Sequence, residues 1–131
     1  MTANDWQLLI DSALAARGRA YAPYSNFTVG AALMADDGEI FLGCNVENAS
    51  YGMTICAERA AVCSAVVAGQ QKFRALAIAT AGGHAPCGAC RQVLAEFNED
   101  LAILIINADL PTKVLEVSLK ALLPGKFTLP E

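Results

Sequence analysis

The sequence predicts an α/β fold in which helices form layers on a mixed β-sheet. Two observations predict it. After an initial hairpin, apolar segments of strand length alternate with segments of helical periodicity, which is the order found in layered α/β domains. The apolar run at residues 101–106 is unbroken, as in a central strand covered on both faces. The 131 residues contain no repeat, linker or low-complexity segment, so we expect one domain over residues 1–131.

The first predicted element is a helix that Asn4 or Asp5 caps and that ends near Arg17 and Gly18. Its apolar residues recur at helical spacing, so that one face covers the sheet. These residues are Trp6, Leu9, Ile10, Ala13 and Leu14.

Two strands, over residues 27–34 and 39–46, are predicted to follow a turn-rich loop at residues 21–26. The Asp-Asp-Gly sequence at residues 36–38 joins them and is typical of a hairpin turn. Ala, Gly and Val dominate the first strand, and such small side chains let a packed helix or a partner subunit approach closely.

Residues 55–68 are predicted to form a helix that Gly69 ends as a C-terminal cap. The segment is apolar on nearly all sides, with Glu58 and Arg59 as its only charges. We therefore expect this helix to be buried in the centre of the domain. Residues 73–80, rich in Ala and Ile, are predicted to form a short strand.

The last third of the chain is predicted to begin with a helix over residues 88–98, followed by the central strand at 101–106. Residues 114–117 favour an edge strand. Ser118 can cap a short helix over residues 119–122, which a Pro-Gly pair ends.

The composition excludes two classes of function. Charged residues make up 17% of the chain, the net charge is −4, and the Lys and Arg residues are scattered, so no basic stripe is present to bind nucleic acid. No uncharged apolar run reaches the ~18 residues that span a bilayer. The first helix carries Asp11 in its middle, unlike a secretory signal, and we expect a cytoplasmic protein. Hydrophobic residues make up 55%, and we expect part of this surplus to be buried between subunits.

Three cysteines have the spacing of ligands to one metal ion. Cys87 and Cys90 are three residues apart, so their sulfurs share one face of the first turn of a helix that begins after Pro86. Cys56 supplies a third thiolate. Five cysteines, an odd number, favour metal binding over a disulfide framework. Three protein ligands and one open position are typical of a catalytic Zn²⁺ site.

Glu58 supplies a proton-carrying group beside this site. It is two residues from Cys56, and residues i and i+2 of a helix point to different faces, so Glu58 leans over the open position instead of binding the metal. A carboxylate beside a metal-activated water is what a proton-shuttling hydrolase needs. Together these residues form the three-cysteine version of the zinc-deaminase signature.

Two arginines and two further cysteines lie near these motifs. Arg59 sits on an otherwise apolar helix, where an unpaired cation is costly, so we expect it to donate hydrogen bonds to a ligand thiolate. For Arg91, that role and a surface or interface ion pair both stay open. Cys63 lies about 10 Å beyond Cys56 along a helix that rises ~1.5 Å per residue, which is too far to share a zinc ion. We expect Cys63 and Cys44 to be small buried hydrophobes.

Motifs along nearly the whole chain carry a resemblance to a known family. They are residues 27–33 (FTVGAAL), 45–52 (NVENASYG), 54–59 (TICAER), 86–92 (PCGACRQ) and 122–127 (LLPGKF). On these motifs the sequence resembles the small, zinc-dependent cytidine deaminases of pyrimidine salvage, of the homotetrameric kind. The resemblance implies a three-layer α/β/α sandwich around a mixed five-stranded sheet.

The resemblance also implies a reaction. Water activated by zinc attacks C4 of the cytosine ring of cytidine or deoxycytidine, while Glu58 moves protons to N3 and then to the departing ammonia. Phe27 packs on the base, Asn45 and Glu47 hydrogen-bond the sugar hydroxyls, and Ala57 belongs to the same substrate site.

The family forms homotetramers, which implies that other subunits complete each site. By this resemblance Ala49, Tyr51 and the tail residue Phe127 serve a neighbouring subunit. The last apolar residues of the chain follow the Pro-Gly stop and have no further element of their own to pack under.

Three alternatives stay open. His84 lies three residues before Cys87, and with Cys56 and Cys90 it would form a closed, structural Cys₃His zinc site. A redox dithiol at Cys87 and Cys90 is the second, although it leaves the third cysteine and the glutamate without a role. Blasticidin-S deaminases share the zinc motifs, but residues 45–52 resemble the nucleoside enzymes.

Overall fold

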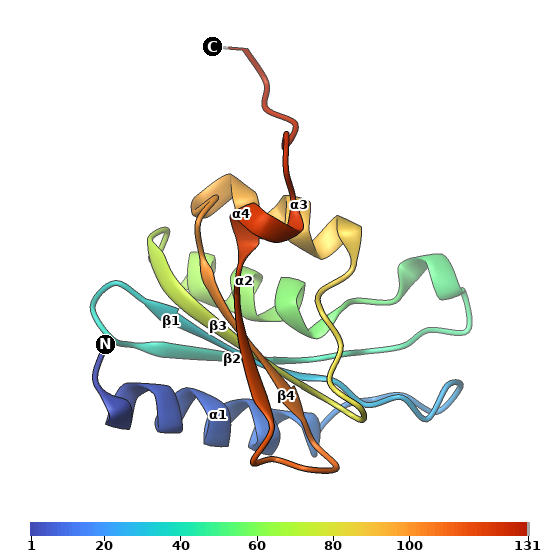
Figure 1. Ribbon diagram of the computed structural model, residues 1–131. Helices are drawn as coiled ribbons and strands as arrows, with labels where there is room; N and C mark the ends of the chain where they lie inside the picture. Colours follow the sequence, from blue (N-terminus) through green and yellow to red (C-terminus); the bar gives the residue numbers. More distant parts are fainter. Residues whose placement is uncertain (131) are drawn as a thin grey trace.

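The computed structural model describes residues 1–130, which form one five-stranded mixed sheet with helices on it (Figure 1). The elements, in chain order, are α1 (Ala3–Arg17), β1 (Gly30–Ala35), β2 (Ile40–Cys44), the 3₁₀-helix η1 (Tyr51–Met53), α2 (Ala57–Val67), β3 (Phe73–Thr80), α3 (Gly88–Phe97), β4 (Ala102–Asn107), β5 (Val114–Ser118) and α4 (Leu119–Leu122). The strand order is β2-β1-β3-β4-β5. The pair β3 and β4 is parallel, and the other neighbours are antiparallel.

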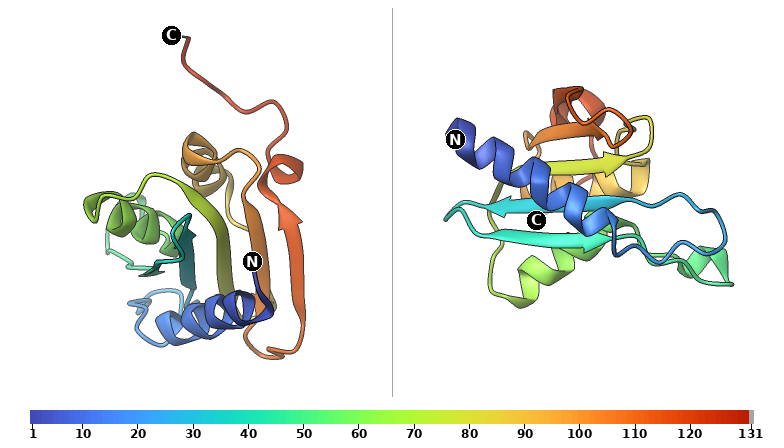
Figure 2. Two further views of the ribbon diagram at one scale, coloured as in Figure 1. Left: turned by 90° about the vertical axis from the view of Figure 1, so that its left-hand side faces the viewer. Right: turned by 90° about the horizontal axis from the view of Figure 1, so that it is seen from below.

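Helices cover both faces of the sheet, so the predicted three-layer α/β/α sandwich is confirmed. In Figure 1, α1 lies below the sheet while α2 and α3 lie above it, and the view from below in Figure 2 shows α1 crossing the strands. Leu9 and Met34 belong to the apolar cluster between α1 and the sheet. Leu33 and Leu94 belong to the cluster on the other face. The neighbours Leu33 and Met34 of β1 point to opposite layers, as alternate positions of a strand must.

Two glycines let helices lie close to the strands. A side chain on Gly30 of β1 would overlap the backbone of α1 at Ala13 and Arg17. A side chain on Gly43 of β2 would overlap the backbone of α2 at Ala57. The small residues predicted to admit a packed helix therefore do so.

Helix α1 has a different cap from the predicted one. Thr2 is the N-cap, because its Oγ1 accepts a hydrogen bond from the backbone N–H of Asp5 at 3.1 Å. The Asp5 carboxylate accepts in turn from the backbone N–H of Thr2 at 2.9 Å, which completes a capping box. Asp5 thus acts one turn inside the helix, and Asn4 is not the cap. The predicted end near Arg17 is confirmed.

The hairpin strands are shorter than predicted. Strand β1 begins at Gly30 instead of residue 27, and β2 ends at Cys44 instead of residue 46. The cause is the side chain of Asn45, whose Oδ1 accepts from the N–H of Val29 at 2.9 Å and whose Nδ2 donates to the carbonyl of Phe27 at 2.8 Å. At this end of the hairpin one backbone hydrogen bond remains, from the N–H of Asn45 to the carbonyl of Val29 at 3.2 Å, and the Asn45 side chain makes the other contacts.

Helix α2 is buried on one face only, so the prediction that it lies buried in the centre of the domain was wrong. Ala61 and Val62 face the core, whereas Val67 is 87% exposed. Cys63 is exposed as well, and it is not the buried hydrophobe that we expected. The helix also begins at Ala57 instead of residue 55, because residue 55 pairs with residue 46 in an isolated bridge.

The C-terminal elements from β3 to α4 agree with the predicted ranges to within one residue at each end. β5 is an edge strand, as predicted, and Ser118 caps α4 by accepting from the N–H of Ala121 at 3.2 Å. Beyond α4 the tail leaves the body of the molecule (Figure 1). No helix among residues 1–130 is long and apolar enough to cross a membrane.

Replacing Gly30 by alanine tests the close packing of α1 on β1. The added methyl group would overlap the Ala13 carbonyl. We expect Gly30→Ala to lower the free energy of unfolding by about 1–3 kcal/mol, measured by urea unfolding at a fixed protein concentration.

Gly18→Ala is the matched control at the end of the same helix. Gly18 has φ −65° and ψ −12°, which alanine adopts freely. The nearest atom to an added methyl group would be 3.4 Å away, so we expect a change below ~0.5 kcal/mol. Equal losses in the two variants would contradict the packing argument.

Candidate active site

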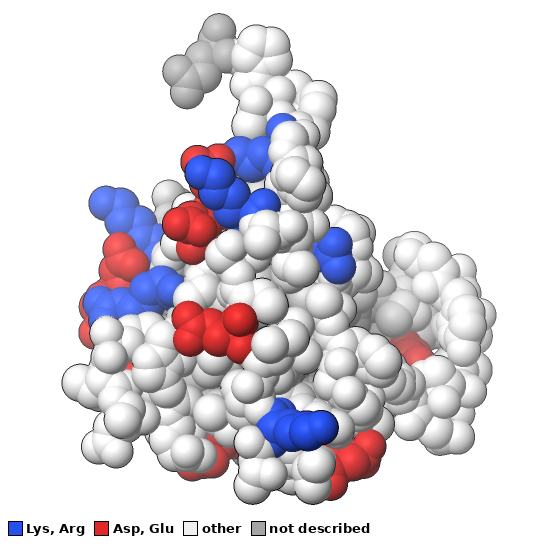
Figure 3. All heavy atoms as spheres, viewed as in Figure 1, with Lys and Arg blue, Asp and Glu red and all other residues white. Residues whose placement is uncertain are grey.

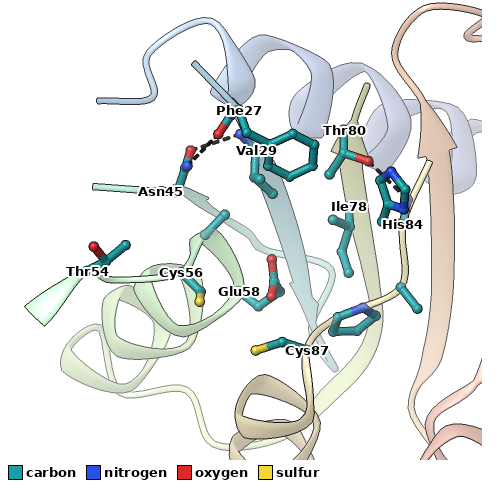
Figure 4. A pocket seen from close by; sticks show the side chains of 13 residues that line it. Phe27, Val29, Asn45, Thr54, Cys56, Glu58, Ile78, Thr80, His84 and Cys87 are labelled. Atoms are coloured by element: carbon teal, nitrogen blue, oxygen red, sulfur yellow. Dashed lines mark hydrogen bonds between the residues drawn. The ribbon is translucent and has the colours of Figure 1, made fainter. Parts of the chain in front are cut away.

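A cavity of about 240 Å³ opens where the carboxyl end of β3 meets the N-termini of α2 and α3 (Figure 4). Ligands of α/β folds commonly bind beyond the carboxyl ends of strands. The residues lining the cavity come from five separate segments and are Phe27, Val29, Asn45, Thr54, Cys56, Ala57, Glu58, Ile78, Thr80, His84, Ala85, Pro86 and Cys87.

Three cysteine sulfurs meet beside this cavity. The Sγ atoms of Cys56, Cys87 and Cys90 all lie within 4.8 Å of one another. Sulfurs that share a tetrahedral zinc ion at ~2.3 Å are about 3.8 Å apart, so this donor set fits the ion. Among residues 1–130, these three form the only group of three or more His, Cys, Asp or Glu donors with such spacing. The cluster does not include His84, the fourth ligand of the closed structural alternative.

The first turns of two helices hold the sulfurs. Cys56 is the N-cap of α2, and Cys87 is the N-cap of α3. The Cys87 sulfur accepts from the backbone N–H of Cys90 at 3.5 Å. Because a helix N-terminus carries partial positive charge, both positions favour the thiolate form that zinc requires.

Arg59 makes the thiolate contact that the sequence predicts. Its Nη2 donates to the sulfur of Cys56 at 3.2 Å and to the carbonyl of Thr54 at 3.4 Å. The hydrogen bond between Cys56 and Cys90 lowers the pKa of Cys56 to about 5, and Arg59 adds to this effect. The same contact raises the pKa of Cys90, which is also buried. Cys56 is thus the first of this pair to ionise.

Glu58 is buried in the cavity wall, with 5% of its surface exposed. Figure 4 shows its carboxylate between Cys56 and Cys87, pointing into the cavity. Burial raises the pKa of Glu58, because an ionised carboxylate loses hydration there. A carboxyl group with a raised pKa can both accept and donate a proton near neutral pH.

Phe27 and His84 lie together on the other side of the cavity (Figure 4). Their ring centroids are 5.9 Å apart. The backbone N–H of His84 donates to the Thr80 hydroxyl at 3.0 Å, which holds the loop before α3 against the end of β3. Thr80 and Pro86 also line the cavity, although the sequence motifs did not predict them as wall residues. The position of Thr80 as the last residue of the predicted strand was a usable signal.

Four predicted substrate-binding residues do not line the cavity: Glu47, Ala49, Tyr51 and Phe127. Glu47 is buried, but its carboxylate bonds to the loop before β1. Ala49 lies just before η1 and Tyr51 is its first residue, on the segment that projects at the right of Figure 1. Tyr51 is 61% exposed. Phe127 is 68% exposed in the tail, where its carbonyl accepts from Nε2 of Gln92 at 3.0 Å.

Arg91, whose role the sequence left open, joins two segments of backbone. Its Nε donates to the carbonyl of Pro86 at 2.7 Å, and its Nη1 donates to that of Leu122 at 2.9 Å. Arg91 therefore ties the start of α3 to the end of α4. Cys44 is half-buried, and its thiol lies 3.6 Å from the carbonyl of Arg19, so it is less buried than expected.

Charged side chains of both signs are interspersed on the face shown in Figure 3, and no continuous basic patch is visible there. The lobe at the right of that view is mostly uncharged. Segments around residues 20–27 and 46–55 form this uncharged lobe (Figure 1). The large apolar side chains that they expose are Tyr21, Tyr24, Phe27, Val46, Tyr51, Met53 and Ile55.

Comparison of the sequence with known proteins assigns the chain to a family. The family described as the cytidine and deoxycytidylate deaminase zinc-binding region matches residues 3–105, a range that includes all three clustered cysteines. A cytidine deaminase of Sporosarcina psychrophila is 49% identical over 127 residues, which are 95% of this chain and 92% of that protein. A probable cytidine deaminase of Dictyostelium discoideum is 41% identical over 98% of this chain and 87% of its own length.

Solved structures agree with this assignment. The crystal structure of cytidine deaminase from Burkholderia pseudomallei has a TM-score of 0.88 and 49% sequence identity. The match covers 97% of this chain and 100% of the Burkholderia chain. The enzyme from Mycobacterium tuberculosis has a TM-score of 0.81 and 44% identity over 95% of this chain and 98% of its own. With the family match, these relatives and the three-cysteine cluster, the chain belongs to the zinc-dependent cytidine deaminases.

Proposed function

We propose that this protein hydrolyses cytidine and deoxycytidine to uridine and deoxyuridine, with release of ammonia, in pyrimidine salvage. The observation that carries the proposal is a buried carboxylate, that of Glu58, facing a cavity beside three clustered thiols. Relatives named cytidine deaminase over most of the chain support the choice of substrate.

The chain's own residues supply the proton transfers. Zinc, when held by Cys56, Cys87 and Cys90, supplies a Lewis acid that makes water a nucleophile at neutral pH. The Glu58 carboxylate takes a proton from the attacking water and gives it to N3 of the ring. It then passes the second water proton to the amino group on C4 as the C4–N bond breaks. One water is consumed, one ammonia leaves, and Glu58 returns to its starting state.

Arg59 acts on this chemistry through Cys56. With three thiolates as its ligands, a Zn²⁺ ion would leave the site with a net charge of −1, which would oppose the ionisation of water there. Arg59, whose Nη2 donates to the Cys56 sulfur, would offset part of this negative charge. The N-termini of α2 and α3 act in the same direction.

The cavity walls orient the nucleoside. The apolar side chains of Val29 and Ile78 and the ring of Phe27 receive the flat base. Ala57 is the first residue of α2, and the first N–H groups of a helix lack partners within it, so they can bond to a polar edge of the base. Asn45, with Glu47 beyond it, receives the sugar hydroxyls.

Other chains of a homotetramer complete each site in this proposal. Tyr51 and Phe127 are exposed on segments that project from the body, so neither residue covers its own cavity. The uncharged lobe and the outer face of α2, with Val66 and Val67, expose apolar surface. Apolar surface of this kind is commonly covered by association, because removing it from water is favourable by ~25 cal/mol per Å² before the entropic cost of association is subtracted.

We place the protein in the cytoplasm, because its five cysteines are free thiols, which suits a reducing compartment. The net charge of −4 argues against nucleic acid as a partner.

Turnover followed by ultraviolet absorbance tests the proposed activity and its proton carrier together. We expect zinc-loaded protein to convert cytidine and deoxycytidine but not free cytosine, which lacks the sugar. Glu58→Gln should retain zinc and fold, yet lose roughly 10²- to 10⁴-fold in kcat, because an amide cannot carry the proton.

Zinc content and circular dichroism are the controls for this variant. Activity retained by correctly folded, zinc-loaded Glu58→Gln would mean that the proton carrier lies elsewhere. Absence of ammonia release by the unmodified protein would refute the activity itself.

Metal analysis of cysteine variants tests the ligand set. We expect one zinc per chain in the unmodified protein and none in Cys90→Ala, together with a lower free energy of unfolding, because metal binding contributes to folding. Cys63→Ala is the matched control, since it removes the same atom from an exposed position outside the cluster. Equal zinc content in the two variants would contradict the assignment.

Co-expression of two variants tests whether sites are shared between chains. Glu58→Ala and Phe127→Ala chains should each be inactive or impaired alone. If Phe127 serves a neighbour's site, mixed oligomers contain some sites with both groups intact and regain part of the activity. If both groups serve their own chain's site, mixing gives no more than the sum of the separate activities, which would contradict sharing.

A further inference from the structure

A hydrogen-bond network around Glu47 joins the loop before β1 to the segment after β2. The Oε1 atom of Glu47 accepts from the backbone N–H of Tyr24 at 3.0 Å and of Ser25 at 3.1 Å. Its Oε2 atom accepts from the hydroxyl of Ser25. That hydroxyl accepts in turn from the backbone N–H of Phe27 at 3.0 Å. Ser25 is therefore the link between Glu47 and Phe27.

The direction of each hydrogen bond in this network is fixed by the groups involved. The N–H of Phe27 can only donate, so the Ser25 hydroxyl must direct its own proton at Glu47. An ionised carboxylate offers about four acceptor positions. Both positions on Oε1 and one on Oε2 are used, which leaves one acceptor position on Oε2. The hydrogen bonds, that of the Ser25 hydroxyl first, hold the pKa of Glu47 below its ordinary value, so the group is ionised at neutral pH.

Glu47 and Asn45 face the same side of their segment. Val46 lies between them and bridges to Ile55, so its neighbours point to one side while Val46 itself is 45% exposed on the other. Asn45 lines the cavity and bonds to the carbonyl of Phe27, while Glu47 reaches the N–H of Phe27 through the serine. Asn45 thus holds the carbonyl of Phe27, and Glu47 holds its N–H through Ser25.

The backbone between the serine and Phe27 has an unusual conformation that the network holds in place. Asn26 has φ 58°, and it is the one non-glycine residue among residues 1–130 with positive φ. Such a conformation costs energy and persists where the surroundings fix it. The N–H of Asn26 donates to the carbonyl of Ala22 at 3.0 Å, and its two neighbours are held as described. These hydrogen bonds therefore set the position of the Phe27 backbone, from which its ring reaches the cavity.

We propose that Ser25 is a positioning residue for sugar recognition, because it leaves Glu47 a single acceptor position for a donor hydroxyl and fixes that position relative to Phe27. The inference rests on the proposed nucleoside substrate and adds the chemical requirement at its sugar. A sugar that presents a hydroxyl satisfies Glu47. A sugar that presents fluorine at the same place does not, because fluorine cannot donate a hydrogen bond.

Kinetics of Ser25 variants on two substrates test this role. We expect Ser25→Ala to lower kcat/KM for cytidine about tenfold, mainly through KM, because a hydrogen bond to a charged group is lost. The loss for 2′,3′-dideoxycytidine should be much smaller, since this substrate offers Glu47 no hydroxyl at those positions. Ser25→Thr keeps the hydroxyl and should restore the cytidine value. Ser12→Ala, which removes a hydroxyl from α1, is the matched control and should change neither.

A double variant separates this role from a general effect on the loop. If Ser25 acts through Glu47, adding Ser25→Ala to Glu47→Gln should cost little more on cytidine than Glu47→Gln alone. Equal losses on both substrates in Ser25→Ala, or additive losses in the double variant, would overturn the proposal.

The unmodified protein gives an independent test with fluorinated substrates. We would compare cytidine analogues that carry fluorine in place of the 2′- or the 3′-hydroxyl with the analogues that carry hydrogen there. At one of these two positions, the fluorinated analogue should have a kcat/KM no higher than that of the analogue with hydrogen. Turnover of both fluorinated analogues at the rate of cytidine would overturn the inference while leaving the proposed activity intact. Failure of the unmodified protein to turn over cytidine would refute the proposed function and the inference with it.

Discussion

The active site depends on three cysteine sulfurs that lie within 4.8 Å of one another. Zinc binds thiolates, and thiolates this close repel each other, so the protein must supply positive charge where they meet. Two helix N-termini and Arg59 do this. The sheet order β2-β1-β3-β4-β5 makes the arrangement geometrically available, because α2 and α3 pack on the same face and into the same apolar cluster. Gly43 lets α2 lie against β2 closely enough for its first residue to reach the cavity.

The same site also buries the carboxylate of Glu58. Placing this carboxylate beside clustered thiolates is unfavourable, because groups of like charge repel each other. Glu58 lies beside groups that become negative, and it is 5% exposed, so both neighbours and burial disfavour its charge. A structural protein would gain stability from an apolar residue there. The cost is tolerable where a raised pKa is needed for proton transfer, and strongly shifted groups in a cavity are typical of catalytic sites. The site is therefore built for chemistry at the expense of stability.

Sequence patterns predicted the elements whose ranges depend on neighbouring residues. They did not predict features that depend on contacts between residues far apart in the chain. Strand β3 and helix α4 match their predicted ranges because apolar periodicity and a serine cap determine them. The start of β1 was placed three residues early, because the side chain of Asn45, far along the chain, bonds to the backbone of Val29 and Phe27 where further strand pairing was expected. Spacing grouped the cysteines correctly, but it could not show that the Glu47 carboxylate binds a loop more than twenty residues away. The exposure of Cys63 was missed for a related reason, since an apolar face can be covered by the chain itself or by another copy.

Exposed aromatic residues connect the shape of one chain to the chemistry of the site. Phe27 lines the cavity and is 41% exposed, while Tyr51 and Phe127 are more exposed still and lie on segments directed away from the body. Apolar rings in water are unfavourable, and an open cavity admits water that weakens the electrostatic interactions needed for catalysis. Covering the uncharged lobe with another chain would remove both costs together. The network through Ser25 holds the backbone of Phe27, a residue that both lines the cavity and is exposed on the uncharged lobe. One loop of this chain therefore shapes the cavity and the exposed apolar surface together.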